Sequence, residues 1–260
     1  MIKSINDLTI HNKPLNNALN EEVCKVIGSG WYVLGQAVET FELAFADYCN
    51  ASSCVSVASG TDALEMALRA LGVGEQDEVI TVANAGGYST AAILACGAVP
   101  RYIDISLENL LIDLSSLPEL LNDRTKVIIV THLFGQAVAM DRVMEIADKA
   151  GISVIEDCAQ PHGARWNGRP VGSLGAVGCF SFYPTKNLGA LGDGGVVISS
   201  DPEIVFRLKQ LRQYGWGSKY RSVLPGGRNS RLDEMQAAVL SVKLPYLDSW
   251  NAERRTVAEN

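Results

Sequence analysis

The 260-residue sequence predicts an α/β protein whose largely parallel sheet is covered by helices. Two observations support this fold class. Segments with apolar residues at helical spacing alternate along the chain with short apolar runs bounded by turn residues. The short runs are rich in β-branched residues, as strands buried in a covered sheet should be.

Seven runs are expected to form strands, and three periodic segments are the clearest helices. The helices fall around residues 38–48, 63–71 and 143–150, with Asp141 as the N-cap of the third. A further helix should begin at Asp201, because a proline suited to the first helical turn follows this capping residue. The expected strands are residues 54–58, 78–82, 99–103, 127–131, 153–156, 176–182 and 194–199.

The C-terminal residues 232–260 are interpreted as one long helix interrupted at Pro245, because proline kinks or divides a helix. No cap or terminating glycine follows. The polar residues at the end of the sequence therefore suggest that the chain stops just as it enters another element.

Composition argues against several classes of protein. The net charge of -7 disfavours a general nucleic-acid binder, which needs an excess of Lys and Arg. No apolar run approaches the roughly 20 residues that span a bilayer, and the N-terminus lacks the apolar stretch of a signal peptide. We expect a cytoplasmic protein with no membrane partner. The six cysteines form no CxxC pair, so neither a disulfide framework nor a metal site is indicated.

One segment reverses the overall charge. Residues 207–231 contain seven basic residues and no acidic one. Two interpretations remain open: an anion docks there, or the segment is a solvated basic face with a mobile glycine-rich loop.

A lysine between an apolar strand and a glycine-rich stretch is the strongest chemical signal. Lys186 follows the expected strand 176–182 and precedes the glycine-rich residues 189–195. Glycines let backbone approach a ligand closely, and desolvation lowers the pKa of a lysine and makes it a nucleophile toward aldehydes. A solvated surface lysine is the ordinary alternative, but the flanking pattern favours a reactive one.

Two carboxylates, Glu156 and Asp157, end the expected strand 153–156, and ligands bind at such strand ends in α/β proteins. A buried carboxylate needs a cation or donors, and a protonated pyridine nitrogen would serve. Capping of the following turn is the alternative.

A third element lies at residues 59–61, which join a strand to a helix, where N–H groups and hydroxyls could bind an anion. Ordinary N-capping explains that third element equally well.

These three elements, in this order, resemble the DegT/DnrJ/EryC1/StrS family of nucleotide-sugar aminotransferases, which are fold-type I pyridoxal-phosphate enzymes. The resemblance implies a three-layer αβα sandwich around a mostly parallel mixed sheet. It also implies that residues 1–244 form a large cofactor-binding domain with its N-terminal segment. Residues 245–260 would begin the helix that leads to a small C-terminal domain, which this chain largely lacks. The matching segments include SGTDAL at 59–64, EDCAQPHGA at 156–164, SFYPTKNLGALGDGG at 181–195 and residues 227–238.

The family motifs imply roles for individual residues. Lys186 would hold pyridoxal 5'-phosphate as a Schiff base, and Asp157 would pair with the pyridine nitrogen. Gln160 would lie near the ring hydroxyl. The phosphate would be held by Gly60, Thr61 and Ser181.

The same resemblance implies a homodimer with shared active sites, because Asn229 would reach the phosphate of the partner subunit's cofactor. The family commonly stacks an aromatic residue on the cofactor face. The segment 83–88 departs from that pattern, and Tyr88 is the nearest candidate. His132 and His162 are interpreted as structural histidines with satisfied hydrogen bonds, because a lysine already supplies the proton shuttle.

The implied reaction moves an amino group from L-glutamate to C3 of a dTDP-linked keto-6-deoxyhexose. Related dehydratases carry histidine in place of the Schiff-base lysine, so Lys186 favours amino transfer, and its neighbours look more like those of the 3-keto-sugar enzymes. The aromatic residues of the basic segment could stack on the nucleotide base. The residues expected to contact the sugar nucleotide are Trp31, Tyr183, Lys219 and Arg221.

Two alternatives from other classes were weighed. A non-catalytic regulatory or assembly protein with the same fold, lacking the C-terminal domain, remains open. A nicotinamide-dependent oxidoreductase is disfavoured, because no GxGxxG follows the first strand.

Overall fold

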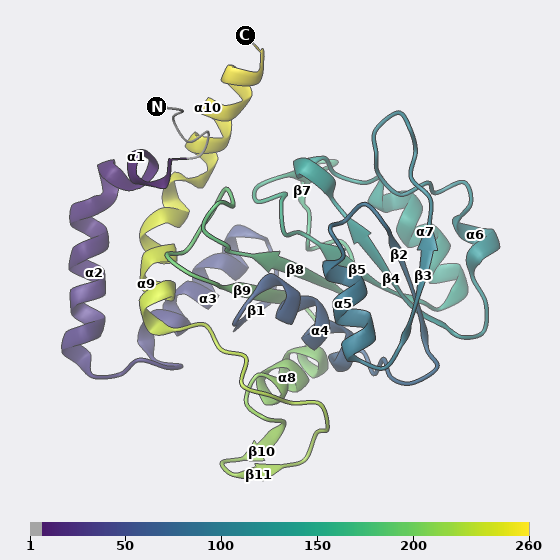
Figure 1. Ribbon diagram of the computed structural model, residues 1–260, viewed down its shortest axis with the longest axis horizontal. Coiled ribbons are helices and arrows are strands. Elements are labelled where there is room, and N and C mark those ends of the chain that lie inside the picture. The colour runs from purple at the N-terminus through teal and green to yellow at the C-terminus, as the bar shows by residue number, and fades with distance from the viewer. Residues whose placement is uncertain (1–6, 260) are drawn as a thin grey trace.

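The computed structural model describes residues 7–259, so the expected domain limits at residues 1 and 260 lie outside the described part. Its main sheet has seven strands in the order β1-β9-β8-β5-β4-β2-β3 (Figure 1). All seven lie within two residues of the expected positions. They are β1 (Ser53–Val57), β2 (Glu78–Val82), β3 (Val99–Ile103), β4 (Thr125–Thr131), β5 (Ser153–Asp157), β8 (Val177–Ser181) and β9 (Gly195–Ser199).

The sheet is mixed but mostly parallel. The strands β3, β2, β4, β5 and β8 are joined by parallel pairings. Strand β9 lies between β8 and β1 and is antiparallel to both, so β1 returns to the common direction. The carboxyl ends of six strands therefore meet at one edge, where an α/β sheet binds ligands.

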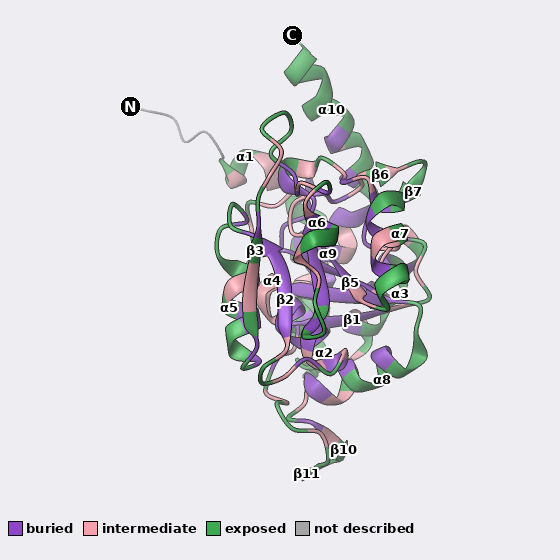
Figure 2. Cartoon of the chain, turned by 90° about the vertical axis from the view of Figure 1, so that its right-hand side faces the viewer, coloured by how far each residue is buried: buried purple, intermediate pink, exposed green. Residues whose placement is uncertain are grey.

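Helices cover both faces, which explains the apolar strands. In β4, Val127 and Ile129 belong to one core cluster while Ile128 and Val130 belong to another, because successive side chains of a strand point to opposite faces. The sheet is thus the buried middle layer of three (Figure 2). One face packs against α4 (Gly60–Ala70), α5 (Tyr88–Ala95) and α8 (Pro202–Leu211), and the other against α3 (Gln36–Tyr48), α6 (Leu117–Leu120), α7 (Met140–Ala150) and α9 (Glu234–Lys243).

Two helices have the N-caps that the sequence suggests, and a third helix lacks its expected N-cap. Asp201 caps α8 by accepting from the N–H of Glu203 at 2.8 Å, as expected. Ser59 caps α4, with its Oγ 3.1 Å from the nitrogen of Asp62. The N-cap expected at Asp141 is wrong, because α7 begins at Met140 and Asp141 is its second residue. The Asp141 carboxylate instead accepts from the indole N–H of Trp166 at 3.0 Å, a tertiary partner that local pattern does not reveal.

The C-terminal part is helical and divided at Pro245, as expected. After α9 comes a 3-10 turn, Leu244–Tyr246, and then α10 (Leu247–Glu259), which projects away from the sheet (Figure 1). The N-terminal elements α1 (Leu8–Asn12), Lys13–Leu15 and α2 (Asn16–Ser29) lie beside these helices, and Leu19 packs on Val239 of α9.

Four short strands and one 3-10 turn are the remaining elements of the described chain. They are the turn Leu133–Gly135, the hairpin β6 (Arg165–Trp166) and β7 (Arg169–Pro170), and the hairpin β10 (Trp216–Ser218) and β11 (Arg221–Ser222).

The part of the chain that the structure describes contains no helix with the length and hydrophobicity of a membrane span.

A buried carboxylate links the N-terminal part of the chain to the C-terminal part. Glu234, the first residue of α9, accepts from the N–H groups of Gly35, Ala37 and Val38 at 2.8 to 2.9 Å. Those groups lie at the start of α3, where a helix leaves its first N–H groups without internal partners. Glu234 is thus an N-terminal cap supplied from almost 200 residues away.

Glu234→Leu should lower the free energy of unfolding by roughly 3 kcal/mol, because buried N–H groups lose a charged acceptor. Urea denaturation followed by circular dichroism measures the change. Glu203→Gln, at an exposed side chain of α8, is the control and should shift stability by less than about 0.5 kcal/mol. Equal effects of the two substitutions would contradict the capping role.

Candidate active site

The residues singled out from the sequence gather at the carboxyl edge of the parallel strands. Asp157 ends β5 and Ser181 ends β8. Gly60 begins α4, shortly after β1 ends. Lys186 lies in the loop that leaves β8, held by its own N–H bonded to the carbonyl of Tyr183 at 2.9 Å. Topology alone therefore brings three segments that are far apart in sequence to one edge.

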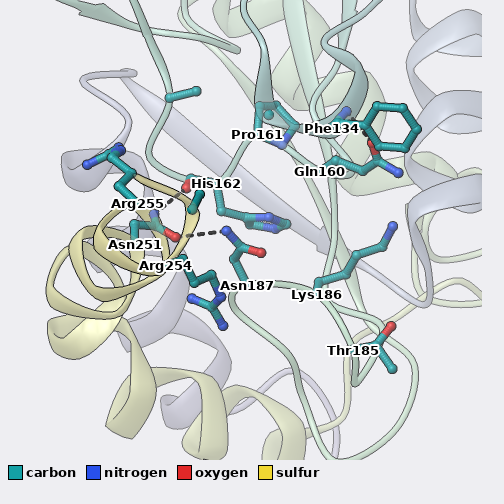
Figure 3. Close-up of a pocket in the computed structure, with 13 residues that line it drawn as sticks. Phe134, Gln160, Pro161, His162, Thr185, Lys186, Asn187, Asn251, Arg254 and Arg255 are labelled. Atoms are coloured by element: carbon teal, nitrogen blue, oxygen red, sulfur yellow. Dashed lines mark hydrogen bonds between the residues drawn. The ribbon is translucent and has the colours of Figure 1, made fainter. Parts of the chain in front are cut away.

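A cavity of about 550 Å³ opens beside Lys186 (Figure 3). The lysine side chain points toward the wall formed by Gln160 and Phe134, while α10 forms the opposite wall. Among the described residues that line this space, three are cationic, namely Lys186, Arg254 and Arg255, and none is acidic. The cavity therefore favours anionic ligands.

The lysine is set up as a nucleophile. Lys186 is half-buried, and this burial lowers the pKa of its ammonium group, while the nearby charge of Asp157 partly opposes the shift. A lowered pKa leaves a larger fraction of neutral amine at neutral pH, which is the form that attacks a carbonyl. The predicted reactive lysine is thus placed in the surroundings that such reactivity requires.

Asp157 is a buried carboxylate with few partners. Its Oδ1 accepts from the N–H of Ala159 at 3.1 Å, and the hydroxyl of Thr131 lies 3.4 Å from Oδ2. Burial raises the pKa of Asp157, although the N–H of Ala159 and the positive charge of Lys186 act in the opposite direction. A carboxylate in this position would gain from a cationic ligand.

The neighbouring carboxylate has a different role. Glu156 accepts from the N–H groups of Gly172, Leu174 and Gly175 at 2.7 to 2.8 Å, and from Nε2 of His132 at 3.0 Å. Glu156 is therefore saturated and holds a loop in place. Between the two carboxylates that the sequence left open, only Asp157 remains available to a ligand.

His132 is confirmed as a satisfied structural histidine. Its Nδ1 accepts from the N–H of Val138 at 3.1 Å, so Nε2 holds the proton and donates it to Glu156. The ligand atoms of His132, Glu156 and Cys158 lie within 4.8 Å of one another, a spacing compatible with a metal. However, hydrogen bonds occupy the first two residues, and burial raises the pKa of the Cys158 thiol well above its usual range. The cluster is better explained as structural.

The expectation of satisfied hydrogen bonds is wrong for His162, although the ring is packed as a structural residue. Both ring nitrogens are buried, and neither has a partner at full hydrogen-bond geometry among the described residues, while nearby backbone groups of Ser181 and Gln160 partly oppose the effect of burial on the pKa. The ring packs between Phe180 and Phe182, with centroids 5.7 and 5.8 Å away, and points toward the side of the cavity where Lys186 lies (Figure 3). Burial lowers its pKa to about 4, so the imidazole is neutral at neutral pH.

The start of α4 is pressed against the end of β8. A Cβ atom on Gly60 would lie 2.6 Å from Cβ of Ser181, so no larger residue fits there. Thr61 follows Gly60 in the first turn of α4, where the helix dipole and exposed N–H groups attract anions. Gly60, Thr61 and Ser181 are therefore brought together, as the sequence predicted.

Other predicted residues are dispersed. Gln160 lines the cavity, and its Oε1 accepts from the N–H of Phe134 at 2.5 Å. Tyr88 is the exposed first residue of α5, and Tyr183 is exposed in the loop before Lys186. Trp31, also exposed, donates its indole N–H to the carbonyl of Val33 at 2.7 Å, near the start of α3.

The basic hairpin lies away from the cavity of its own chain. Lys219 and Arg221 belong to the β10–β11 hairpin, which projects from the end of the molecule opposite α10 (Figure 1). Asn229 is exposed on the returning segment, and both neighbours of Asn229 are tied to Asp62. The structure therefore places Lys219 and Arg221 away from the cavity of their own chain, and it holds Asn229 near the first turn of α4.

Part of the local positive charge is neutralised within the fold. Arg212 pairs with Glu42 at 2.5 Å, and Arg228 pairs with Asp62 and, at 2.8 Å, with Glu65. Lys219 and Arg221 form no ion pair with any described residue. Lys219 and Arg221, together with Lys209 and Arg231, are therefore the cations of this segment that have no ion-pair partner among the described residues.

Aromatic side chains surround that tip. The ring centroids of Trp216 lie 5.3 Å from both Tyr214 and Tyr220, and Nζ of Lys219 lies 5.2 Å from the Tyr220 centroid. Tyr220 is 79% exposed, which is unusual for a large ring unless a partner or ligand covers it.

Several residues that line the cavity were not predicted from the sequence. They include Asn187, Asn251, Arg254 and Arg255, which come from two segments more than 60 residues apart, and of these only Asn187 lies within a recognised motif. Polar residues on a C-terminal helix look like a solvated face in the sequence, so no local pattern signalled their position.

The architecture is that of the large domain of fold-type I aminotransferases, as its likeness to solved structures shows. The X-ray structure of Streptomyces venezuelae DesV in complex with a ketimine intermediate has a TM-score of 0.94 and 43% identity, covering 97% of this chain and 68% of that one. NtdA from Bacillus subtilis with bound cofactor pmp has a TM-score of 0.85 and 28% identity, covering 95% and 57% of the two chains.

Residues 14–260 match the DegT/DnrJ/EryC1/StrS aminotransferase family, and this chain belongs to that family. A relative from Streptomyces venezuelae, dTDP-3-amino-3,4,6-trideoxy-alpha-D-glucose transaminase, is 44% identical over 252 residues, which are 97% of this chain and 66% of the relative. The chain thus spans about two thirds of the length of the curated relatives it matches. The family resemblance seen in the sequence is confirmed.

Asp157→Asn should raise the free energy of unfolding of the cofactor-free protein at pH 7. Because burial raises the pKa of this carboxyl, the charged form destabilises the folded state. The stability of the native protein therefore falls as pH rises from about 4 toward the raised pKa, and the variant lacks this fall. Denaturant titrations between pH 4 and 8 measure it.

Asp123→Asn, at an exposed carboxylate, is the control and should give a pH profile like that of the native protein. A difference between Asp157→Asn and the native protein that does not shrink toward pH 4 would contradict the assignment.

Proposed function

We propose that this chain is the cofactor-binding part of a pyridoxal-phosphate-dependent aminotransferase that moves an amino group from L-glutamate to C3 of a dTDP-linked keto-6-deoxyhexose. The proposal depends most on one observation: a half-buried lysine of lowered pKa lies near a buried carboxylate at the ligand-binding edge of the sheet. The relative named as a dTDP-3-amino sugar transaminase supports the substrate and the carbon.

The residues at this edge fit pyridoxal 5'-phosphate. Asp157 would accept from the protonated ring nitrogen, which would compensate the burial of its charge. The N–H groups of the first turn of α4 would bind the phosphate, with the hydroxyls of Thr61 and of Ser181, which packs against Gly60, beside it. The solved NtdA structure, which holds the cofactor pmp, supports the same class of cofactor.

Two further residues would contact the cofactor ring. Gln160 lies on the cavity wall toward which Lys186 points, and its amide would meet the ring hydroxyl (Figure 3). Tyr88, exposed at the start of α5, would cover the ring face.

When bound, the cofactor draws electrons away from the substrate carbon that bears the nitrogen. The chain's own residues supply the rest. Lys186 would hold the cofactor through Nζ, and its free amine would carry a proton to or from the substrate carbon. Asp157 would keep the ring nitrogen protonated. Both half-reactions use the same two side chains.

The charges of the site suit the two substrates. Glutamate and a sugar nucleotide are both anions, and the cavity is lined by cations without an acidic residue among the described lining. Tyr183 and Trp31, both exposed, remain candidates for contacts with the sugar.

We assign Lys219, Arg221 and Asn229 to the site of a partner subunit in a homodimer. The hairpin extends away from the cavity of its own chain, so Lys219 and Arg221 would reach the site of another copy. Asn229 is assigned to the partner's site because it matches the family asparagine that reaches the phosphate of the other subunit's cofactor. Arg and Lys would bind the diphosphate, and the aromatic cluster around Trp216 would stack on the base.

The purified protein incubated with pyridoxal phosphate should turn yellow, and borohydride should bleach the colour and fix the cofactor mass on Lys186. Lys186→Ala should lose both signals, because the covalent attachment is gone. Absorbance and peptide mass spectrometry measure the outcome. Lys209→Ala, at an exposed lysine of α8, is the matched control.

Two results separate the alternatives. A colourless native protein would refute the cofactor and with it the proposed activity. A yellow protein that transfers no amino group from glutamate to any of a panel of nucleotide keto-sugars would favour the non-catalytic regulatory interpretation.

Reversing both charges of the hairpin, Lys219→Glu with Arg221→Glu, should raise the KM for the nucleotide sugar by roughly tenfold or more, because charge-assisted contacts to the diphosphate are lost. The kcat should change little. Steady-state assays of the dimeric protein measure both, with Lys149→Glu of α7 as the control. An unchanged KM would remove the hairpin from the substrate site.

A further inference from the structure

A buried lysine lies beneath the loop that carries Lys186. Lys243, at the end of α9, is only 2% exposed, and its Nζ donates to the carbonyl of Gly189 at 2.8 Å. No described carboxylate pairs with it, and burial alone lowers its pKa to about 8. A buried ammonium group with a single carbonyl partner destabilises a fold, so its presence needs an explanation other than stability.

The same helix contacts the loop at a second point. The N–H of Leu191 donates to Oε1 of Gln236 at 2.8 Å. Residues 236 and 243 are two helical turns apart and therefore lie on one face of α9. Leu240, between them on that face, belongs to the same core cluster as Leu188 and Ala190. One face of α9 thus contacts the loop by a donor, an acceptor and an apolar side chain.

A third contact comes from α10. The amide of Asn187 donates to Oδ1 of Asn251 at 2.8 Å, and Asn251 donates in turn to the carbonyl of His162 at 2.8 Å (Figure 3). Asn251 therefore joins the residue next to Lys186 to the segment that follows β5. The three contacts are made at Asn187, Gly189 and Leu191, all on the C-terminal side of the lysine.

The loop itself is tightly folded between its ends. A Cβ atom on Gly189 would lie 2.3 Å from the carbonyl oxygen of Pro184, so the chain closes on itself around Lys186 and needs a glycine there. The N–H of Ala190 returns to the carbonyl of Phe182 at 2.8 Å. Because the loop is closed, a shift at Gly189 must also move Lys186.

We infer that the inner face of α9, through Lys243 and Gln236, is a clamp that fixes the position of the Lys186 side chain at the cavity. Lys243 and Gln236 are positioning residues: they contact the loop, not the cavity lining. The clamp rests on the proposed function only for its catalytic consequence, since the contacts themselves are independent of any ligand.

An apolar side chain at position 243 would suit the surrounding core better than an ammonium group. It could not bind the Gly189 carbonyl, however, and this carbonyl would remain buried without a donor. Filling the core would therefore be served by leucine or methionine, whereas holding the loop at the Gly189 carbonyl requires a donor at the end of a long side chain.

Hydrogen exchange of the cofactor-free protein tests the clamp directly. In Lys243→Met, the amides of residues 186, 190 and 191 should exchange up to about tenfold faster, because one hydrogen bond to the loop is lost. The amides of β5 and β8 should keep their native rates. Gln236→Leu should give the same local pattern, and it also covers the case in which Lys243→Met fails to fold.

Ser241→Ala is the matched control on the same helix. The hydroxyl of Ser241 is buried and has no hydrogen-bond partner among the described residues. Its removal should leave exchange in the loop unchanged. Unchanged loop exchange in both clamp variants, or a rise that occurs only together with the whole core, would overturn the inference.

The catalytic consequence is measured separately. In both clamp variants, kcat should fall by roughly ten- to a hundredfold with the KM for the nucleotide sugar nearly unchanged, because a displaced amine no longer aligns with the reacting carbon. A KM effect with native kcat would overturn the positioning role. If the native protein takes up no pyridoxal phosphate while loop exchange still rises in the variants, the proposed function fails and the clamp stands.

Discussion

Two adjacent carboxylates at the end of β5 determine how the ligand-binding edge is built. Their side chains point to opposite sides of the strand, as neighbouring strand residues do. Glu156 is surrounded by three backbone N–H groups from residues 172–175, so it fixes the loop that leads into β8. Asp157 receives only one backbone N–H and one hydroxyl. The fold thus uses the acceptor atoms of Glu156 for its own backbone and leaves those of Asp157 mostly unused, at the edge of the sheet where the Lys186 loop also begins.

Most of the sheet could be predicted because a strand buried on both faces must be apolar along its whole length. That property is local, and it was sufficient to locate β4 and β9 within two residues. The order of the strands was beyond reach, because the position of β9 between β1 and β8 depends on pairing between distant segments. The cap of α7 failed for a related reason: Asp141 is bonded to Trp166, 25 residues further on.

The candidate residues Lys186 and Asp157 could also be predicted from the sequence, but the residues that hold the Lys186 loop in place could not. Lys186 and Asp157 lie in motifs whose neighbouring residues indicate the chemistry. Lys243 and Asn251 lie on helices, bond to residues 54 and 64 positions away, and resemble ordinary polar residues in the sequence. The one available signal was a lysine among the apolar residues that end α9. His162 shows the opposite error, because a histidine between two phenylalanines was expected to find partners and has none in the described structure.

The unfavourable burial of Asp157 has a consequence for the amount of protein in a cell. A ligand that binds only the folded state stabilises it in proportion to its concentration, by about 2.7 kcal/mol at a hundred times its Kd. In the proposed enzyme the cofactor would remove the penalty of the buried carboxylate at the same time. Copies without cofactor would therefore unfold more often and be degraded first, so that the abundance of this protein would follow the supply of vitamin B6.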